Sequence, residues 1–260
     1  MIDTHSHIYA EEFDNDRCDA LERAKTAGVE WLILPDIDSS SREQMLTLAK
    51  ENPTYCRAMA GLHPTSVNDN PAWRDEVDMV ERMLSNPPQP LCGVGEIGLD
   101  LYWSQEFYRE QREALHAQME LALHHDLPVV IHTRSAYKEM LDAVATYRGR
   151  GRRGVFHAYA DSVDTARNIL RQGEFMFGIG GVVTFKNSGL DRVVAELPTE
   201  LLLLETDCPY LTPVPHRGKR NESAYVEFVC RKIAELHGKS FEEVDAITTA
   251  SAKRMFNLNG

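Results

Sequence analysis

Short apolar runs recur along the chain, and a helix-like stretch follows each of them. The runs are IDTH (2–5), WLIL (31–34), CRAMAGL (56–62), LCGVGEIG (91–98), PVVIHT (128–133), GVFHAY (154–159), FMFGIGG (175–181) and LLLLETD (201–207). The helix-like stretches are 15–27, 41–50, 72–84, 106–125, 136–147, 162–172, 189–196 and 223–237. Eight strand-then-helix units in 260 residues predict an α/β protein with a parallel sheet closed into a (β/α)8 TIM barrel. We expect one domain over 1–260, with 241–256 as an extra C-terminal helix packed outside the barrel.

Polar side chains that can bind metals stand where the apolar runs end. They are His5 and His7 at the end of the first run, then Glu96, His132, His157 and Asp207 at the ends of the fourth, fifth, sixth and eighth. In a barrel these ends converge on one face, and alternation along the first strand directs Asp3, His5 and His7 to one side. Burying so many unpaired polar groups in a core would cost a few kcal/mol each (about 1–3), so convergent metal ligands explain them better.

Four imidazoles and two carboxylates exceed what one ion needs, because a catalytic zinc site typically uses three protein ligands. The hypothesis is that His5, His7 and Asp207 hold one ion, His132 and His157 hold a second, and Glu96 bridges them at roughly 3.5–4 Å. Nitrogen and oxygen ligands without thiolate suit Zn, Mn, Fe, Ni or Mg. Glu96 and Asp207 are the catalytic candidates, with Asp207 orienting or deprotonating the attacking water. Glu205 is either an outer partner of this centre or a structural hydrogen-bonding group.

The formal net charge of −12, from 28 basic and 40 acidic residues, disfavours a general nucleic-acid or membrane-binding surface. A polyanionic substrate therefore needs metal or a local basic patch. The stretch PHRGKRNES (215–223) follows the eighth run and precedes a helix, a frequent phosphate site in barrels. The phosphate-binding candidates are Arg217, Lys219, Arg220 and Asn221, with Arg134 beyond His132 as a further one.

Three further residues near the same face are candidates for contact with the substrate. His63 in GLHP is a substrate contact or base, or else a histidine that caps a turn. The three tryptophans, Trp31, Trp73 and Trp103, lie in different units, so the sequence indicates no base-stacking platform, although Tyr102 and Trp103 follow Glu96 and are candidates to stack on a base or ring.

The five cysteines, at 18, 56, 92, 208 and 230, show no CxxC spacing, which favours a reducing compartment. No secretory signal pattern precedes Asp3, and no apolar run is long enough to span a bilayer. We expect a cytoplasmic protein with no membrane span and no obligate protein partner.

The motifs DTHSH, GLHP, GEIGLD, VIHTR, ETDCPYLTP and PHRGKRNE, spread from residue 3 to about 225, resemble those of TatD-type metal-dependent hydrolases of the amidohydrolase superfamily. The resemblance implies a metal-dependent phosphodiesterase, usually a DNase with 3′→5′ exonuclease behaviour. It also carries the metal-ligand role onto His5, His7, Glu96, His132, His157 and Asp207.

The function expected is therefore hydrolysis of phosphodiesters in DNA ends or oligonucleotides by a binuclear metal centre. One alternative is an ester or amide hydrolase, such as an aminoacyl-tRNA deacylase or a cyclic-amide hydrolase, because such a centre activates water for attack on carbon as well as on phosphorus. A second is a non-catalytic metal-binding protein.

Overall fold

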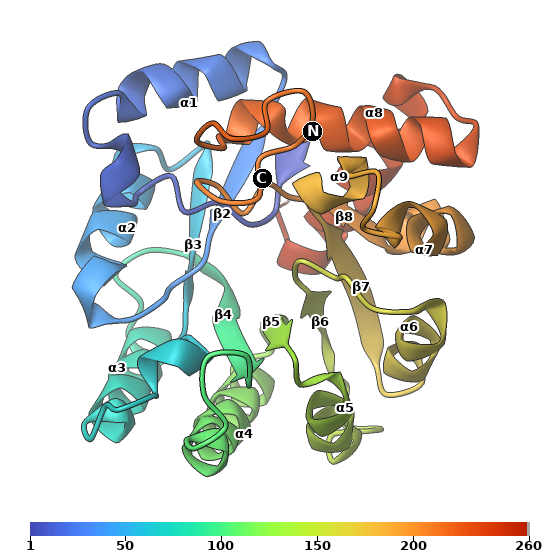
Figure 1. The fold of residues 1–260 in the computed structure, drawn as a ribbon. Helices are drawn as coiled ribbons and strands as arrows, with labels where there is room; N and C mark the ends of the chain where they lie inside the picture. Colours follow the sequence, from blue (N-terminus) through green and yellow to red (C-terminus); the bar gives the residue numbers. More distant parts are fainter. Residues whose placement is uncertain (259–260) are drawn as a thin grey trace.

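The computed structural model describes residues 1–258, and its eight parallel strands form one sheet in the order β1 to β8 (Figure 1). The strands are β1 (Ile2–Asp3), β2 (Trp31–Leu34), β3 (Cys56–Ala60), β4 (Leu91–Asp100), β5 (Val129–Arg134), β6 (Arg153–Phe156), β7 (Glu174–Ile179) and β8 (Leu202–Leu204). The ring is closed between its first and last strands, where the Thr4 amide donates to the Leu204 carbonyl (2.9 Å) and the Asp207 amide to the His5 carbonyl (2.9 Å). The predicted (β/α)8 barrel is confirmed.

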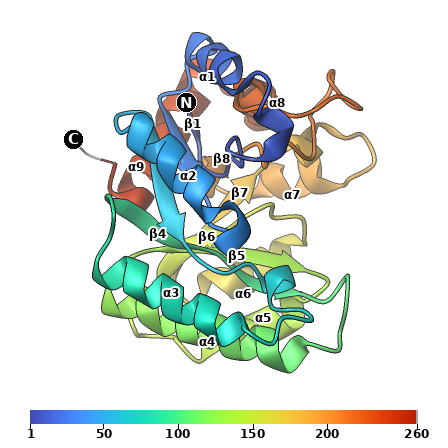
Figure 2. The same cartoon turned by 90° about the vertical axis from the view of Figure 1, so that its left-hand side faces the viewer.

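The helices surround the barrel and lie close to the predicted ranges (Figure 2). They are α1 (Arg17–Thr26), α2 (Ser39–Glu51), α3 (Trp73–Ser85), α4 (Tyr108–His124), α5 (Tyr137–Ala145), α6 (Val163–Leu170), α7 (Leu190–Glu196), α8 (Val226–His237) and α9 (Phe241–Phe256). The helix predicted from residue 223 begins as a 3-10 turn, Ser223–Tyr225, before α8. The single domain was predicted over 1–260, of which residues 259 and 260 lie outside the described residues.

A layer of apolar side chains fills the end of the barrel at which the strands begin. We call this layer the floor, and we call the opposite end of the barrel the mouth. Each strand contributes one member, and the layer consists of Ile2, Ile33, Met59, Cys92, Val130, Val155, Met176 and Leu203. Strands from opposite sides of the ring share this single buried cluster, so these side chains point inward. From α9, Met255 and Phe256 pack on the layer. The C-terminal helix thus closes the bottom of the barrel, whereas the sequence predicted only that it packs outside.

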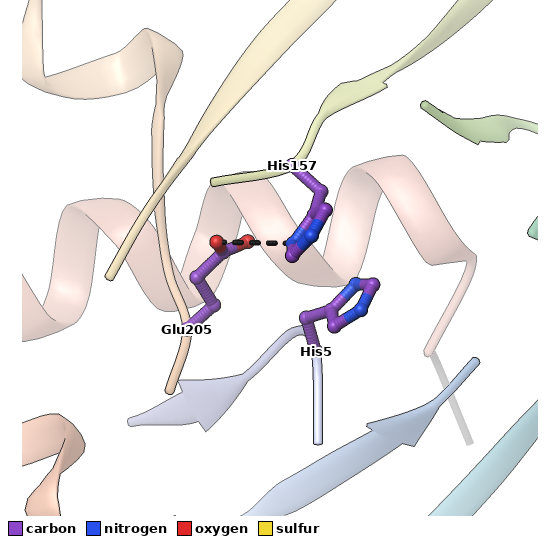
Figure 3. Close-up of side chains that lie close together, drawn as sticks. All are labelled: His5, His157 and Glu205. Carbon is purple, nitrogen blue, oxygen red and sulfur yellow. Dashed lines mark ion pairs between the residues drawn. The ribbon is translucent and has the colours of Figure 1, made fainter. Parts of the chain in front are cut away.

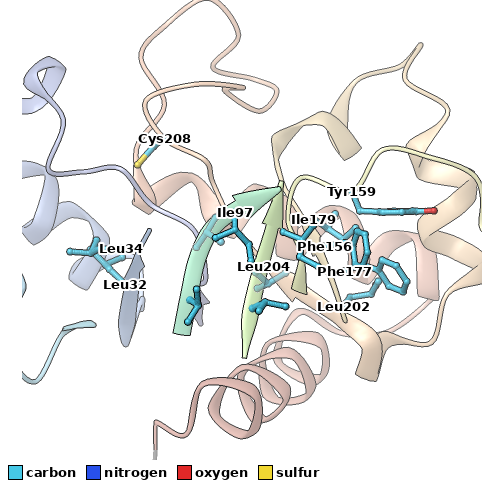
Figure 4. Close-up of a cluster of buried hydrophobic side chains, with 14 of the residues drawn as sticks. Leu32, Leu34, Ile97, Phe156, Tyr159, Phe177, Ile179, Leu202, Leu204 and Cys208 are labelled. Atoms are coloured by element: carbon cyan, nitrogen blue, oxygen red, sulfur yellow. The ribbon is translucent and has the colours of Figure 1, made fainter. Parts of the chain in front are cut away.

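The strand residues between these inward positions face the helices. Leu32 and Leu34 of β2 and Leu202 and Leu204 of β8 belong to the larger outer core (Figure 4). Because side chains alternate along a regular strand, in β5 and β6 the residue two positions after the member of this layer returns to the interior. This alternation places His132 above Val130 and His157 above Val155.

Strand β4 is longer than predicted, so Glu96 lies within it rather than at its end. Its ladder with β5 continues through the pairs Gly98↔His132 and Asp100↔Arg134, after a register shift between Val94 and Ile97. A Cβ at position 98 would collide with the backbone carbonyl of His132, so glycine permits this close approach.

All five cysteines are free thiols. Within residues 1–258, no helix combines the length and apolar character needed to cross a bilayer.

Candidate metal centre

The Glu96 carboxylate lies at the middle of the barrel mouth and is almost fully buried. Its Oε2 is 3.1 Å from His5 Nε2, whereas its Oε1 is 2.8 Å from His132 Nδ1 and 3.3 Å from His157 Nε2. The two oxygens therefore face two different sets of imidazoles.

Asp207 completes the side of the centre that carries His5 and His7. Its Oδ1 is 3.3 Å from His7 Nε2 and 3.8 Å from His5 Nε2, and these two ring nitrogens are 3.2 Å apart. Asp207 has a left-handed backbone (φ 55°), a conformation that aspartate tolerates better than most residues. The Asp207 side chain is 16% exposed, against 3% for Glu96, so it opens toward the mouth. The structure brings together all six residues that were predicted as ligands.

The first strand ends earlier than the alternation of Asp3, His5 and His7 suggested. Strand β1 stops at Asp3, whose carboxylate turns to β8 and accepts hydrogen bonds from the Thr206 amide (2.9 Å) and hydroxyl (2.7 Å). His5 and His7 lie on the segment beyond the strand. Asp3 helps to close the ring and does not face Glu96.

Mutual contact sets the ionisation of these groups. Burial alone would raise the pKa of Glu96, but His157, His63 and His5 together hold it well below its ordinary value. Burial likewise opposes ionisation of Asp207, and the hydrogen bond from His7 and the charge of His157 lower its pKa. Burial would lower the pKa of His157, but Glu205 and Glu96 raise it to about 10. Burial and the neighbouring His157 lower the pKa of His5.

Three imidazoles have an outer partner that fixes which ring nitrogen carries the proton. Tyr9 donates its hydroxyl proton to the Pro35 carbonyl (2.6 Å), so its oxygen must accept from His7 Nδ1 (2.9 Å). His132 Nε2 donates to Asp100 Oδ2 (3.0 Å).

The outer nitrogen of His157, Nδ1, is paired with Glu205 Oε1 at 3.2 Å (Figure 3). Glu205 Oε1 also accepts from the Ala158 amide (2.7 Å), so this carboxylate makes both of the contacts considered for it. In Figure 3 the ring of His5 lies beside that of His157, and their centroids are 3.6 Å apart.

His63 has the opposite arrangement. Its Nδ1 accepts from the Thr65 amide (3.2 Å), so the proton of the neutral ring is on Nε2, which points at Glu96 Oε1 (3.4 Å). His63 therefore caps the turn Pro64–Ser66 and also presents a donor to the centre. In this tautomer His63 donates toward Glu96, and His63, Glu96 and His132 also offer ligand atoms within 4.8 Å of one another.

The donor set fits divalent metal ions. Ligand atoms of His5, His7 and Glu96 lie within 4.8 Å of one another, and in the neutral rings of His7, His132 and His157 the inner nitrogens are the acceptors, because the outer nitrogens face Tyr9, Asp100 and Glu205. Imidazoles held by an outer carboxylate or hydroxyl are the usual surroundings of a metal site. Among the four histidines predicted as ligands, His7 and His132 have a hydrogen-bond partner at the outer nitrogen, and His157 Nδ1 is ion-paired with Glu205. The remaining outer nitrogen, the buried His5 Nδ1, has no hydrogen-bond partner within residues 1–258.

The basic residues predicted for phosphate binding are in different situations. Arg217, Lys219 and Arg134 are exposed. Arg220 is instead paired with both carboxylate oxygens of Asp16 (2.7 and 2.8 Å). Asn221 is buried, and its amide donates to the carbonyls of Thr206 (2.8 Å) and Tyr210 (2.6 Å), so it holds the loop rather than facing the mouth.

Two residues that orient candidate ligands, Tyr9 and Asp100, are absent from the sequence-based candidates. Asp100 lies four residues after Glu96, and Tyr9 lies two after His7. The period of two that identified the inward histidines is also the signal that would have identified both residues.

A sequence model of the family described as TatD related DNase matches residues 2–257. The chain belongs to the TatD family. This TatD-family protein is 36% identical over 264 residues to the uncharacterized metal-dependent hydrolase YabD of Bacillus subtilis (strain 168), with 100% of both chains covered. It is 30% identical over 264 residues to a protein of Erwinia tasmaniensis named 3′-5′ ssDNA/RNA exonuclease TatD, covering 99% of this chain and 100% of that one.

The TatD fold is also found in a solved relative. The crystal structure of YJJV, a TatD homologue of Escherichia coli K12, superposes with a TM-score of 0.91 at 28% identity, covering 99% of this chain and 98% of the other. The resemblance read from the motifs is confirmed, and the chain is a member of a metal-dependent hydrolase family.

Proposed function

We propose that this protein is a phosphodiesterase that removes nucleotides from the 3′ ends of single-stranded DNA at a binuclear metal centre. The observation that carries the proposal is that the two carboxylate oxygens of Glu96 face different imidazoles. Oε2 faces His5, whereas Oε1 faces His132 and His157. His5, His7 and Asp207 would hold one ion and His132 and His157 the other, with the Glu96 carboxylate between the two sets. The ions are drawn from Mg, Mn, Zn, Fe and Ni.

When bound, divalent ions at such a centre lower the pKa of water and offset charge on the phosphate oxygens. Asp207, the most exposed carboxylate of the cluster, accepts the proton of the attacking water. His63 donates from Nε2 and helps to hold a phosphate oxygen. Glu205, Asp100 and Tyr9 keep the other rings in the required tautomer.

The exposed cations at the mouth supply the positive field that the net charge of −12 lacks. Arg217 and Lys219 hold phosphate, and Arg134 joins them from β5. Arg220 and Asn221 act indirectly, because Asp16 and the loop carbonyls already occupy their donors. The name of the Erwinia relative supports a single-stranded nucleic acid as the substrate.

The test compares the activity of one purified sample, in Mg²⁺ or Mn²⁺, on single-stranded DNA and on aminoacyl-tRNA. We expect a 5′-labelled single-stranded DNA to shorten progressively from its 3′ end, and Glu96→Gln to lower kcat by about 100-fold or more, as expected for loss of an electrostatic group. The matched control is Glu120→Gln, a carboxylate that pairs with Arg150 (2.7 Å) away from the centre, which should retain full activity.

Other results would contradict the proposal. Release of free amino acid from aminoacyl-tRNA with the DNA intact would identify an ester hydrolase. Absence of turnover on both substrates by metal-loaded protein would favour a binding protein. Elemental analysis giving one ion or none per chain would exclude the binuclear centre.

A further inference from the structure

Two large aromatic side chains stand exposed beside the mouth, together with an arginine. Tyr102 and Trp103, which follow β4, are 57% and 67% exposed. The Arg134 guanidinium, at the end of β5, lies 3.8 Å from the Tyr102 ring centroid and 5.4 Å from that of Trp103. We call these three residues the β4–β5 platform. Clustered exposed aromatic rings are unusual on a protein surface and point to a ligand.

The platform is fixed to the metal centre through one carboxylate. Asp100 Oδ1 accepts from the amides of Tyr102 (3.0 Å) and Trp103 (3.4 Å), while Asp100 Oδ2 accepts from His132 Nε2 (3.0 Å). The Leu101 amide also donates to the Arg134 carbonyl (3.0 Å). The same side chain therefore sets the position of a candidate metal ligand and of the aromatic loop.

The charge of the platform is available to a ligand. Within residues 1–258, Arg134 has no carboxylate within ion-pair distance, although Arg220 and Arg150 are each bound by one. An unpaired cation beside exposed rings suits a molecule that carries both a planar apolar group and a negative charge. A nucleotide has both, and stacking on aromatic rings accepts any base.

We propose that the β4–β5 platform binds the nucleotide next to the scissile phosphodiester, with its base stacked on Trp103 or Tyr102 and its phosphate held by Arg134. This inference rests on the proposed function. It adds a subsite that extends substrate recognition beyond the bond that is cleaved.

Binding is tested without catalysis, in EDTA, with a short oligodeoxyadenylate. Trp103 is the most exposed of the three tryptophans, since Trp73 is 6% exposed and Trp31 lies under Arg57 (4.5 Å). We expect the oligonucleotide to quench tryptophan fluorescence, and Tyr102→Ala with Trp103→Ala to raise Kd, measured by anisotropy of a labelled strand, about tenfold or more. Trp103→Phe should retain most of the affinity.

The phosphate contact is tested by salt dependence. Arg134→Gln should reduce the slope of log K against log salt by about 0.7, the value for one phosphate contact on a single strand, whereas Arg134→Lys should keep the slope. An unchanged slope in Arg134→Gln would overturn the phosphate part of the inference.

Cleavage assays separate this inference from the proposed function. Wild-type protein should lose kcat/KM on a strand whose penultimate nucleotide is abasic, and the double alanine variant should not distinguish that strand from an intact one. Met79→Ala, which removes a 40% exposed apolar side chain from α3, is the control and should behave as wild type.

If wild-type protein cleaves no DNA, the proposed function fails while the binding titration still tests the platform. If the wild-type protein cleaves and the alanine variants match it on both strands, the platform inference fails. Loss of self-association in the variants with unchanged oligonucleotide affinity would instead identify a protein interface.

Discussion

At the scale of single residues, the centre depends on which nitrogen of each imidazole carries a proton. His7, His132 and His157 face Tyr9, Asp100 and Glu205 with their outer nitrogens, which leaves the inner nitrogens as acceptors. In His63, Nδ1 accepts a hydrogen bond from the Thr65 amide, so Nε2, the nitrogen that faces Glu96, is a donor. Four histidines of one type are thus divided into two chemical roles by their neighbours.

Glu205→Gln tests the orienting role. An amide can present its NH2 group to His157 Nδ1 and oppose the required tautomer, so we expect metal affinity to fall about 10–100-fold. Titration of metal-free protein with Mn²⁺, followed by calorimetry, measures the change. Glu222→Gln removes another buried carboxylate, paired with Arg23 (2.6 Å), and should leave metal affinity unchanged. Equal affinities in wild type and Glu205→Gln would refute the role.

Asp16→Asn tests the ion pair that occupies Arg220. The hydrogen bond from Arg220 holds the pKa of Asp16 below its ordinary value of 3.8, so the stabilisation is complete above about pH 5 and is lost progressively as pH falls further. We expect the variant to be less stable by up to about 1 kcal/mol at pH 7, because the pair is partly exposed. Urea unfolding should give the same difference at pH 8 and pH 5. A difference that disappears already between those values would contradict this assignment.

At the scale of elements, β7 can pass close to the Glu205 carboxylate because the residue at position 178 is glycine. A Cβ at Gly178 would collide with the Glu205 carboxylate, whereas a Cβ at Gly180 would meet it only at 3.7 Å. The strand pair therefore leaves a space in which this buried carboxylate reaches His157.

Gly178→Ala should displace Glu205, destabilise the fold by about 1–3 kcal/mol and weaken metal binding. Gly180→Ala is the matched control and should change both properties little. Chemical denaturation and metal titration of the two variants provide the comparison. Similar behaviour of the two would show that Glu205 adjusts without cost.

The sequence predicts elements well where a local period is visible. Val130 with His132, and Val155 with His157, follow the alternation of a strand, so these two histidines could be placed in the barrel interior from spacing alone. It could not predict that Asp16 would take Arg220, because that contact joins positions 204 apart in the chain. Nor could it predict that the two carboxylate oxygens of Glu96 face different imidazoles, because this depends on how the closed barrel orients a single side chain.

At the scale of the whole molecule, the barrel has a closed floor and an open mouth. The apolar layer and α9 occupy the lower end, while the imidazoles and carboxylates occupy the upper end. Stability and chemistry therefore reside in different layers of one interior.

Phe256→Ala should expose this separation. The Phe256 side chain is 2% exposed against the floor, so its truncation should cost about 3–5 kcal/mol in the free energy of unfolding. Below the lowered melting temperature, kcat should stay within about twofold of wild type, because the mouth is untouched. Arg254→Ala, on the exposed side of α9, is the control for the helix itself. A large loss of kcat in folded Phe256→Ala protein would show that floor and mouth are coupled.

The alternation that stacks His132 on Val130 also limits how such a chain can change in length. Deleting Ile131, the one residue between them, would turn the imidazole toward the helices and bring Thr133 into its place, so one lost codon would remove a candidate ligand from the centre and put a polar ring into the outer core. Insertions and deletions should be tolerated in the connections at either end of the strands, and excluded from the few residues that separate the floor from the mouth.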